Sequence, residues 1–496
     1  MFKRISTVLF LLVIIASTTH AATATIQLPR SGQTGCYDAT GKVIDCTTQG
    51  QTQDGKVQAG MPWPSPRFTD NGDGTVTDNL TSMVWAKDAN LMKTRDPGFD
   101  NDLTFSWVSS TAGDGAVMWQ HALDYIKKLN TENYLGYNDW RLPNINELNS
   151  LIDLQKTSPA LPSSHPFTNL QYSNSSNWIR YWSSTTSVAF PDNAFSVDMD
   201  SGDASGVAAG KVAPFYVWPM RGGEWSGVYS NIPKTGQTSC YDYRGTTIPC
   251  AGTGQDGELL KGVSSPSPRF TDNANGTVTD NLTGLIWTKA ANNPGPAACV
   301  PDAVYATWQG ALDFVGCLNT NSYLGYSDWR LPNREELASL LDHQNELPML
   351  PAGHPFNNLG ASYNYWTSST RYGKPSDVWF VQMDYGYLRT GFGKTAYGND
   401  FYVWPVRGGQ LENPVVSNLL KGDINNDGKI DIFDALLTLQ YGLNLIPHDT
   451  ATDAKYLASA DVAPLDTATM KPKGDARIDV MDALVILQRA VNLVSW

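Results

Sequence analysis

Apolar and polar positions alternate along most of the chain in short runs separated by turn residues, and two stretches depart from this pattern. Between residues 119 and 129, and again between 308 and 318, apolar side chains recur every three or four positions. The two stripes consist of Trp119, Ala122, Leu123, Ile126 and Leu129, and of Trp308, Ala311, Leu312, Val315 and Leu318. They predict two amphipathic helices whose apolar faces belong to a core.

A second, shorter helix is expected in each half, directly after a Leu-Pro pair. Asn144 with Glu147, and Asn333 with Glu336, have the spacing of an N-cap and its reciprocal acid. Residues 363–369 and 378–383 are typical of strands, and Asn71-Gly-Asp-Gly is typical of a hairpin turn. Each half is therefore predicted to be α+β.

These elements occur twice because the chain contains an internal duplication. Tyr134-Leu-Gly-Tyr-Asn-Asp-Trp-Arg-Leu-Pro-Asn returns at Tyr323 with one change, and Val217-Trp-Pro-Met-Arg-Gly-Gly returns at Val403 with one change. The period is too long for a solenoid. We expect two whole domains, residues 28–224 and 232–409, with the same strand order.

The two copies differ in length at one place. Trp119 follows Trp85 by 34 positions, but Trp308 follows Trp287 by 21, a difference of 13. We expect the extra residues to loop out of the first copy.

Residues 1–21 predict a secretory signal peptide. Lys3 and Arg4 precede a short apolar run, which small and polar residues follow. The run is shorter than a bilayer span, so no membrane span is expected. A secreted or cell-surface protein is the prediction.

Export makes the six cysteines candidates for disulfides. Two pairs share the same separation around turn residues, and two further cysteines occur in the second half alone. The predicted pairs are Cys36 with Cys46, Cys240 with Cys250, and Cys299 with Cys317.

The formal net charge of −13 disfavours binding to nucleic acid. Neither copy is basic enough to act as a general site for polyanions.

After a linker at residues 410–419, a different module occupies residues 420–496. Its first loop has oxygen-bearing residues at positions 1, 3, 5, 9 and 12 and Gly428 at position 6, followed by a helical run. This pattern wraps a hard cation, so calcium is the expected cofactor. The predicted ligands are Asp423, Asn425, Asp427, Lys429 through its carbonyl oxygen, Asp431 and Asp434.

The second loop repeats this pattern with an insertion, and Ala463 stands at its third position. We expect it to bind calcium more weakly. Its predicted metal residues are Asp461, Asp475, Arg477, Asp479 and Asp482.

The module resembles a type I dockerin, because it is duplicated and has Asp rather than Glu at position 12. The resemblance implies a small all-α calcium-binding module of paired EF-hand-like loops and helices, and a cohesin-type partner. In dockerins, positions 10 and 11 help select that partner. Here they are Ile432-Phe433 and Val480-Met481, apolar residues that could instead pack within the chain.

The duplicated domain resembles the Lcl C-terminal domain family of bacterial surface proteins. The resemblance rests on four motifs in order: Thr277-Val-Thr-Asp-Asn-Leu-Thr-Gly-Leu-Ile-Trp, Asp328-Trp-Arg-Leu-Pro-Asn, Tyr365-Trp-Thr-Ser-Ser-Thr and Val403-Trp-Pro-Val-Arg-Gly-Gly. It implies a C-type-lectin-like fold and, from the adhesin that names the family, recognition of sulfated glycans.

The motif residues themselves are expected to be core and framework rather than ligand contacts, since they define the fold. They are Trp140, Arg141, Trp182, Trp218, Arg221, Trp329, Arg330, Trp366, Trp404 and Arg407. No glycan-binding residue is singled out by the sequence.

No catalytic constellation stands out: the six histidines are dispersed, and no pair of acids has a diagnostic spacing. The leading hypothesis is a non-catalytic protein that binds glycans or mediates adhesion through tandem lectin-like domains. The alternatives are a dockerin-bearing component of an extracellular polysaccharide-degrading assembly and an enzyme of the formylglycine-generating type.

Overall fold

The structure is a computed structural model of the chain, and it divides into two compact units, residues 1–410 and 411–496. It describes residues 26–48, 52–102, 111–172, 179–206, 210–222, 232–292, 295–299, 307–360, 364–395, 401–408, 421–422, 424, 430, 432–443, 460–464 and 477–490. The predicted signal peptide and the predicted linker at 410–419 lie outside these residues.

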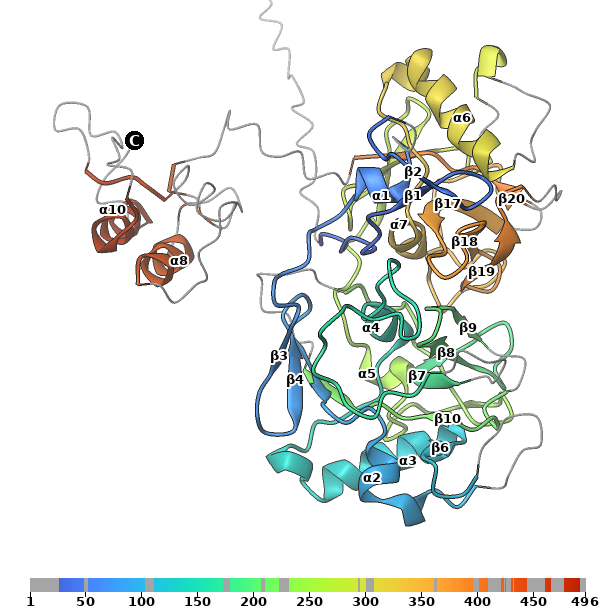
Figure 1. Ribbon diagram of the computed structural model, residues 1–496, viewed down its shortest axis with the longest axis vertical. Helices are drawn as coiled ribbons and strands as arrows, with labels where there is room; N and C mark the ends of the chain where they lie inside the picture. The colour runs from blue at the N-terminus through green and yellow to red at the C-terminus, as the bar shows by residue number, and fades with distance from the viewer. Residues whose placement is uncertain are drawn as a thin grey trace, which may run out of the picture. The chain divides into compact units, whose positions relative to one another are not determined.

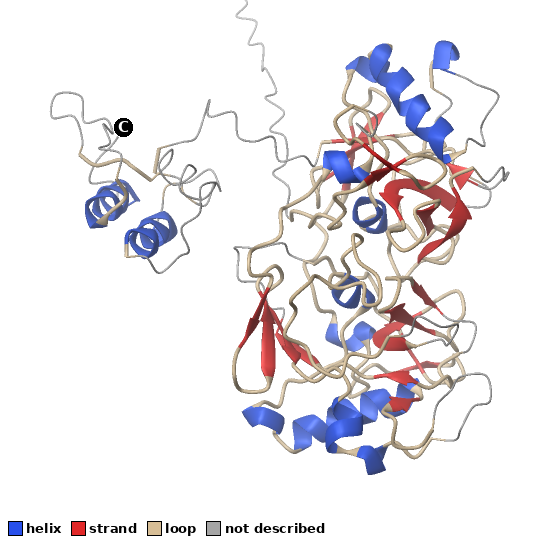
Figure 2. Ribbon diagram, viewed as in Figure 1, coloured by secondary structure: helices blue, strands red, loops and turns tan. Residues whose placement is uncertain are grey.

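The first unit contains both copies, and among its described residues nine strands form one sheet across them (Figures 1 and 2). Copy 1 contributes, in sheet order, β9 (Ala204–Gly206), β8 (Ala194–Asp198), β7 (Arg180–Thr186), β10 (Phe215–Tyr216) and β6 (Ala116–Val117). Copy 2 contributes β19 (Tyr387–Gly393), β18 (Asp377–Gln382), β17 (Asn364–Thr370) and β20 (Phe401–Tyr402). The shared part of the order is the same in both copies, which confirms the prediction from the duplication.

Each copy also has a smaller antiparallel sheet of four strands among the described residues. In copy 1 these are β3 (Phe68–Asp70), β4 (Thr75–Asp78), β5 (Met83–Ala86) and β11 (Met220–Gly222); in copy 2 they are β14 (Phe270–Asp272), β15 (Thr277–Asp280), β16 (Ile286–Thr288) and β21 (Val406–Arg407). The β3–β4 turn is the hairpin that Asn71-Gly-Asp-Gly predicts.

The predicted helices form where the sequence places them. The long ones are α3 (Trp119–Thr131) and α6 (Trp308–Thr320), and each buries its apolar stripe. The short ones are α4 (Ile145–Asn149) and α7 (Arg334–Ala338), and each begins with a complete capping box. Mixed helix and sheet is thus confirmed for both tandem domains.

The core continues from one copy into the other. β9 and β19 pair at Ala204 and Leu388, so each copy closes the sheet edge of the other. The ring of Phe195 in copy 1 lies 4.7 Å from His343 and 6.1 Å from Tyr387 in copy 2, measured between centroids. The two domains therefore share one body rather than flexing independently.

The copies also exchange their N-terminal segments. Arm 1 (residues 28–63) carries the hairpin β1 (Cys36–Tyr37) and β2 (Val43–Ile44) and the helix α1 (Asp54–Val57), and α1 lies against β17 of copy 2. Arm 2 (residues 232–265) carries β12 (Cys240–Tyr241), β13 (Thr247–Ile248) and α5 (Asp256–Leu259), and α5 lies against β7 of copy 1. Figure 1 shows both crossings.

Where the copies differ in length, the segment before the long helix is held to that helix by different contacts in each copy. Copy 1 has α2 (Leu91–Arg95) and the 3-10 turn Pro97–Phe99, where Asp96 accepts hydrogen bonds from Tyr125 and Lys128 of α3. In copy 2, Cys317 stands at the place of Lys128 and forms a disulfide with Cys299, which lies in the turn Ala297–Cys299.

The six cysteines pair as the spacing predicts: Cys36 with Cys46, Cys240 with Cys250, and Cys299 with Cys317. The first two bonds close the hairpins of the arms.

The second unit contains two helices among its described residues, α8 (Ile432–Gly442) and α10 (Val480–Ala490). They pack around a small core that includes Tyr441, Val462 and Ile486. In the part of the chain that the structure describes, no helix is long and apolar enough to cross a bilayer.

Candidate functional site

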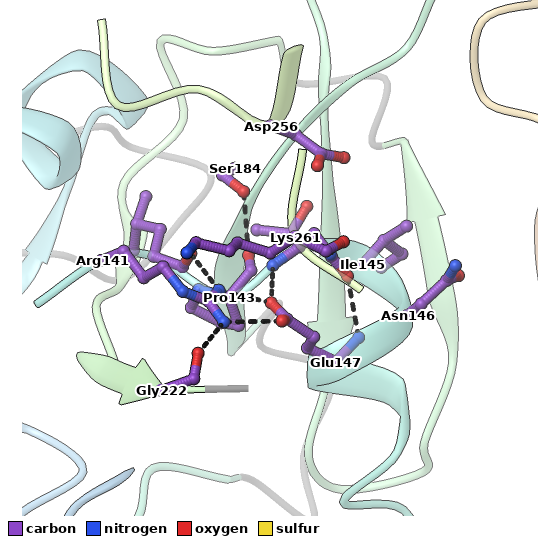
Figure 3. A network of polar contacts seen from close by, with 12 residues as sticks. Arg141, Pro143, Ile145, Asn146, Glu147, Ser184, Gly222, Asp256 and Lys261 are labelled. Carbon is purple, nitrogen blue, oxygen red and sulfur yellow. Dashed lines mark hydrogen bonds and ion pairs between the residues drawn. The ribbon is translucent and has the colours of Figure 1, made fainter. Parts of the chain in front are cut away.

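The Asp-Trp-Arg-Leu-Pro-Asn motif builds a buried ion pair at the start of α4. The guanidinium of Arg141 donates to both carboxylate oxygens of Glu147, at 2.6 and 2.7 Å, and to the carbonyl oxygen of Gly222. Glu147 also accepts the backbone N–H of Asn144, closing the capping box. Figure 3 shows this network, with Asp256 and Lys261 of arm 2 beside it.

Copy 2 repeats the network. Arg330 donates to Glu336 at 2.6 Å through both nitrogens and to the carbonyl oxygen of Gly408. In each copy the pair therefore ties three elements together: the motif loop, the short helix and the last strand of the small sheet.

The tryptophans of the motifs are framework, as predicted. Trp140, Trp182, Trp218, Trp329, Trp366 and Trp404 are all at most 2% exposed. Several indole N–H groups are used inside the core; that of Trp182, for example, donates to the carbonyl oxygen of Val117. Among the described tryptophans, Trp63 alone is partly exposed.

Arg221 and Arg407, which the sequence predicts to be framework, instead belong to a second set of motif residues that lies at the surface. In copy 1, the guanidinium of Arg221 lies 3.8 Å from the ring centroid of Tyr137 and donates to Asp139 at 2.7 Å. The Asp139 side chain is 50% exposed and that of Arg221 is 24% exposed. The hydroxyl of Tyr137 donates to Asp73 in the β3–β4 turn at 3.3 Å. We call these four residues the Tyr137 cluster.

Copy 2 repeats the arrangement of the Tyr, the Arg and the Asp. Arg407 lies 3.9 Å from the ring centroid of Tyr326 and donates to Asp328 at 2.7 Å. Asn275 stands at the place of Asp73. We call Tyr326, Arg407, Asp328 and Asn275 the Tyr326 cluster. Each cluster contains a tyrosine, a guanidinium and an exposed carboxylate. Together these groups can both donate and accept hydrogen bonds.

The model of one family matches the chain in two segments. The Lcl C-terminal domain family covers residues 74–221 and 276–407, more than half of the chain. The chain belongs to this family. The Tyr, Arg and Asp139 or Asp328 residues of the two clusters lie within the matched segments, which end at Arg221 and Arg407, and Asp73 and Asn275 directly precede them. Membership suggests a surface protein. No curated protein and no solved structure matches the chain.

An open depression of about 40 Å³ lies between the two Lcl domains where their short helices meet. It is lined in pairs by Asn146 and Glu335 and by Ser150 and Ser339, together with residues of both arms. Asn149 donates to Glu335, and Asn146 donates to the carbonyl oxygen of Pro233. Both bonds join one copy to the other or to its arm, so the depression is part of the seam between the copies.

Two histidines of the Lcl domains correspond between the copies, and the six cysteines are paired with one another. His165 and His354 occupy equivalent places, and burial lowers the pKa of each imidazole. All six cysteines are paired, so a formylglycine-type reaction would find no free thiol among them.

Most predicted calcium ligands lie outside the described residues: Asp423, Asn425, Asp427, Lys429, Asp431 and Asp475. Asp434, Asp461, Arg477, Asp479 and Asp482 are described. No cluster of three metal-binding side chains occurs among the described residues.

The described acids nevertheless relate the two loops. Asp434 accepts the backbone N–H of Ile424, and Asp482 accepts those of Val462 and Ala463. Ile424 follows Asp423, and Val462 follows Asp461. The last acid of each loop thus bonds to the residue after its first, and this equivalence supports Asp461 as the counterpart of Asp423.

Three of the apolar residues at positions 10 and 11 of the loops are exposed: Ile432, Val480 and Met481 are 61%, 54% and 58% exposed. Leu436 and Leu484 are also exposed, at equivalent places on α8 and α10. The side chain of Phe433 lies outside the described part. The two helices therefore present a paired apolar surface.

Tyr137, Asp139, Tyr326 and Asp328 stand in the longest repeated motif, but no pattern in the sequence sets them apart as surface residues. Asp54, Asp256, Lys211 and Lys394, which hold the arms, are further residues that the sequence-based prediction did not include. A signal was present, because Gln-Asp-Gly occurs at 53–55 and 255–257 and Gly-Lys at 210–211 and 393–394.

Proposed function

We propose that the chain is a non-catalytic, secreted or cell-surface protein that binds glycans through the Tyr137 and Tyr326 clusters. The observation that carries the proposal is the presence of the same solvent-facing Tyr, Arg and Asp set in both Lcl domains. Sugar hydroxyls both donate and accept hydrogen bonds, and aromatic groups with a few placed polar groups are typical of ligand sites. A C-type-lectin-like fold for each domain is part of the proposal.

Two clusters on one body would strengthen binding to a repeating glycan. Once one cluster is bound, the second meets its ligand at a raised effective concentration. Because the copies share a sheet and a core, their separation is fixed, and only glycans with matching spacing would gain.

A glycan array probed with the full chain and with Tyr137→Ala/Tyr326→Ala tests the proposal. The double variant should lose more than tenfold in apparent affinity, and each single variant should lose the gain from bivalency. Tyr243→Ala is the matched control, because Tyr243 is an exposed tyrosine beside Arg244 that lies outside both clusters. Wild-type binding by the double variant would refute the assignment.

We further propose that the second unit is a calcium-binding, dockerin-like module. The equivalent bonds of Asp434 and Asp482 support it, as does the pattern of oxygen ligands in the sequence. The first loop would be held by Asp423, Asn425, Asp427, Asp431, Asp434 and the carbonyl of Lys429, and the ion would offset the repulsion among these carboxylates.

Calorimetry of the full chain with calcium tests this module. Asp423→Ala should abolish the tighter binding event, and Asp475→Ala should abolish the weaker one. Absence of any heat from the wild-type chain would contradict the proposal.

The second candidate function is a dockerin-bearing part of an extracellular polysaccharide-degrading assembly. The exposed residues Ile432, Val480 and Met481 favour it, because an apolar paired surface fits a protein partner. A pull-down with a cohesin should succeed with the wild-type chain and fail with Ile432→Asp/Val480→Asp. Capture of both, or of neither, would set this alternative aside.

A further inference from the structure

Each arm is held on the opposite Lcl domain by a buried lysine. Lys394 of copy 2 donates to the carbonyl oxygens of Tyr37 and Asp38 in arm 1, at 3.2 and 3.3 Å. Lys211 of copy 1 donates to those of Tyr241 and Asp242 in arm 2, at 3.3 and 3.0 Å. Both lysines are at most 1% exposed. Each copy therefore binds the arm of the other copy through one buried lysine.

A glutamine in each arm adds two bonds to the last residue of a strand. Gln33 donates to the carbonyl oxygen of Thr370 in copy 2 and accepts its N–H, at 2.6 and 2.8 Å. Gln237 makes the same pair of bonds with Thr186 in copy 1, at 2.6 and 2.9 Å. Loss of either side chain would leave a buried donor and acceptor unpaired.

A buried carboxylate completes each docking contact. Asp54 of arm 1 accepts the hydroxyl of Ser369 in copy 2, and Asp256 of arm 2 accepts that of Thr185 in copy 1. At the hairpin tips, a Cβ on Gly41 or Gly245 would collide with the backbone of the opposite copy, near Ser376 and Asp192 respectively. Close approach therefore requires glycine at both places.

A Pro-Ser-Pro segment joins each arm to its own copy, Pro64-Ser65-Pro66 for arm 1 and Pro266-Ser267-Pro268 for arm 2. The arms lie outside the segments that match the Lcl family.

The seam between the copies is not symmetric in chemistry. Arg334 of copy 2 is fully buried, and its guanidinium donates to Asn149 and to the carbonyl oxygen of Gly202 in copy 1. The equivalent residues are Ile145 in copy 1 and Ala338 in copy 2. A pair of second copies would set Arg334 against Ala338, and a pair of first copies would set Asn149 against Ile145. Either pairing of two identical copies would lose the buried hydrogen bond between Arg334 and Asn149.

We infer that the strand end and lysine on each Lcl domain form a binding site for the disulfide-bonded arm of another Lcl copy, and that the seam around Arg334 selects unlike copies. The chain is thus two mutually specific partners joined covalently, in the manner of an exchanged dimer. The inference concerns assembly and does not depend on glycan binding.

Cutting the connection between the partners tests the inference on the full chain. A protease site placed within residues 223–231 divides the chain into two halves, each with its own arm. The halves should remain together on size-exclusion chromatography at nanomolar concentration, and native mass spectrometry should show one of each half.

Two matched pairs of variants locate the interaction. Gln33→Ala/Gln237→Ala removes contacts to the opposite copy and should raise the dissociation constant of the cut chain at least tenfold. Gln155→Ala/Gln344→Ala removes the contacts of each arm to its own copy, where Gln155 accepts from Thr34 and Gln344 from Thr238. The second pair should leave the dissociation constant within about twofold of wild type.

Near-ultraviolet circular dichroism of the uncut variants checks that they are folded, and the single variant Gln33→Ala replaces the double if it is not. Three results would overturn the inference: wild-type halves that separate at micromolar concentration, pairs of like halves as abundant as unlike pairs, or an equal effect of both glutamine pairs.

Discussion

Arg141 and Glu147 show how a repeated motif can be structural rather than functional. Both side chains are almost fully buried, and they form a bidentate ion pair. A buried ion pair adds little over an apolar pair of the same shape, but removal of one partner strands a charge. The motif is therefore under constraint at both positions at once.

We predict that Arg141→Met lowers the free energy of unfolding by about 3 to 5 kcal/mol, because Glu147 is left buried and unpaired. Arg141→Met/Glu147→Leu should cost less than the single change, since no charge is stranded. Urea denaturation followed by tryptophan fluorescence measures both, and Arg330→Met is the equivalent change in copy 2. A double variant less stable than the single one would show that the pair itself is stabilising.

The lysines that hold the arms predict a dependence of stability on pH. Burial lowers the pKa of Lys211 and of Lys394 to about 7, from an ordinary value of 10.5. The folded pKa is depressed and the unfolded chain binds the proton more tightly, so stability is full above pH 10.5 and falls as pH drops toward 7.

Each lysine should therefore make the chain about 2 kcal/mol more stable at pH 9 than at pH 7. Lys211→Met removes this contribution, so its urea midpoint should change less between these pH values than that of the wild type. The exposed Lys42→Met is the control. An unchanged pH dependence in Lys211→Met would mean that this lysine keeps its charge when buried.

At the scale of elements, the long helices α3 and α6 are joined to the preceding segment by different kinds of contact. In copy 1, Lys128 of α3 is paired with Asp96 and Glu132 near the surface, and in copy 2 a disulfide from Cys317 of α6 replaces that contact. Partly exposed ion pairs contribute little to stability, whereas a disulfide restricts the unfolded chain.

We predict that Cys299→Ser/Cys317→Ser lowers the free energy of unfolding by about 3 kcal/mol, the loop-closure contribution for a separation of 18 residues. Lys128→Met in copy 1 should cost less. Thermal unfolding of both variants measures the difference, and equal losses would contradict the comparison.

The helices, capping boxes, hairpins and disulfides followed from local pattern, because each is decided by residues close in sequence, as with Asn144 and Glu147. The exchange of arms could not be predicted from local pattern. Gln33 meets Thr370, but Thr186 offers the same groups at the equivalent strand position in copy 1. A duplicated sequence presents each arm with two matching sites, and only geometry decides between them. The exposed clusters were missed for another reason, since exposure of Tyr137 depends on the fold around it.

At the scale of the whole chain, the central claim is that the two Lcl domains form one body closed by exchanged arms. This fixes the separation of the two clusters. The connection also explains why neither copy is a separate body despite its complete set of motifs.

Chemical cross-linking between lysines tests that claim most directly. Lys42 is exposed on the arm 1 hairpin, where the adjacent Gly41 lies against the backbone of Pro375, and the neighbouring Lys374 has a 62% exposed side chain. The account predicts a cross-link between Lys42 and Lys374 in monomeric protein. Its absence from the monomer, while other lysine pairs react, or its presence in dimers alone, would contradict the exchange of arms within one chain.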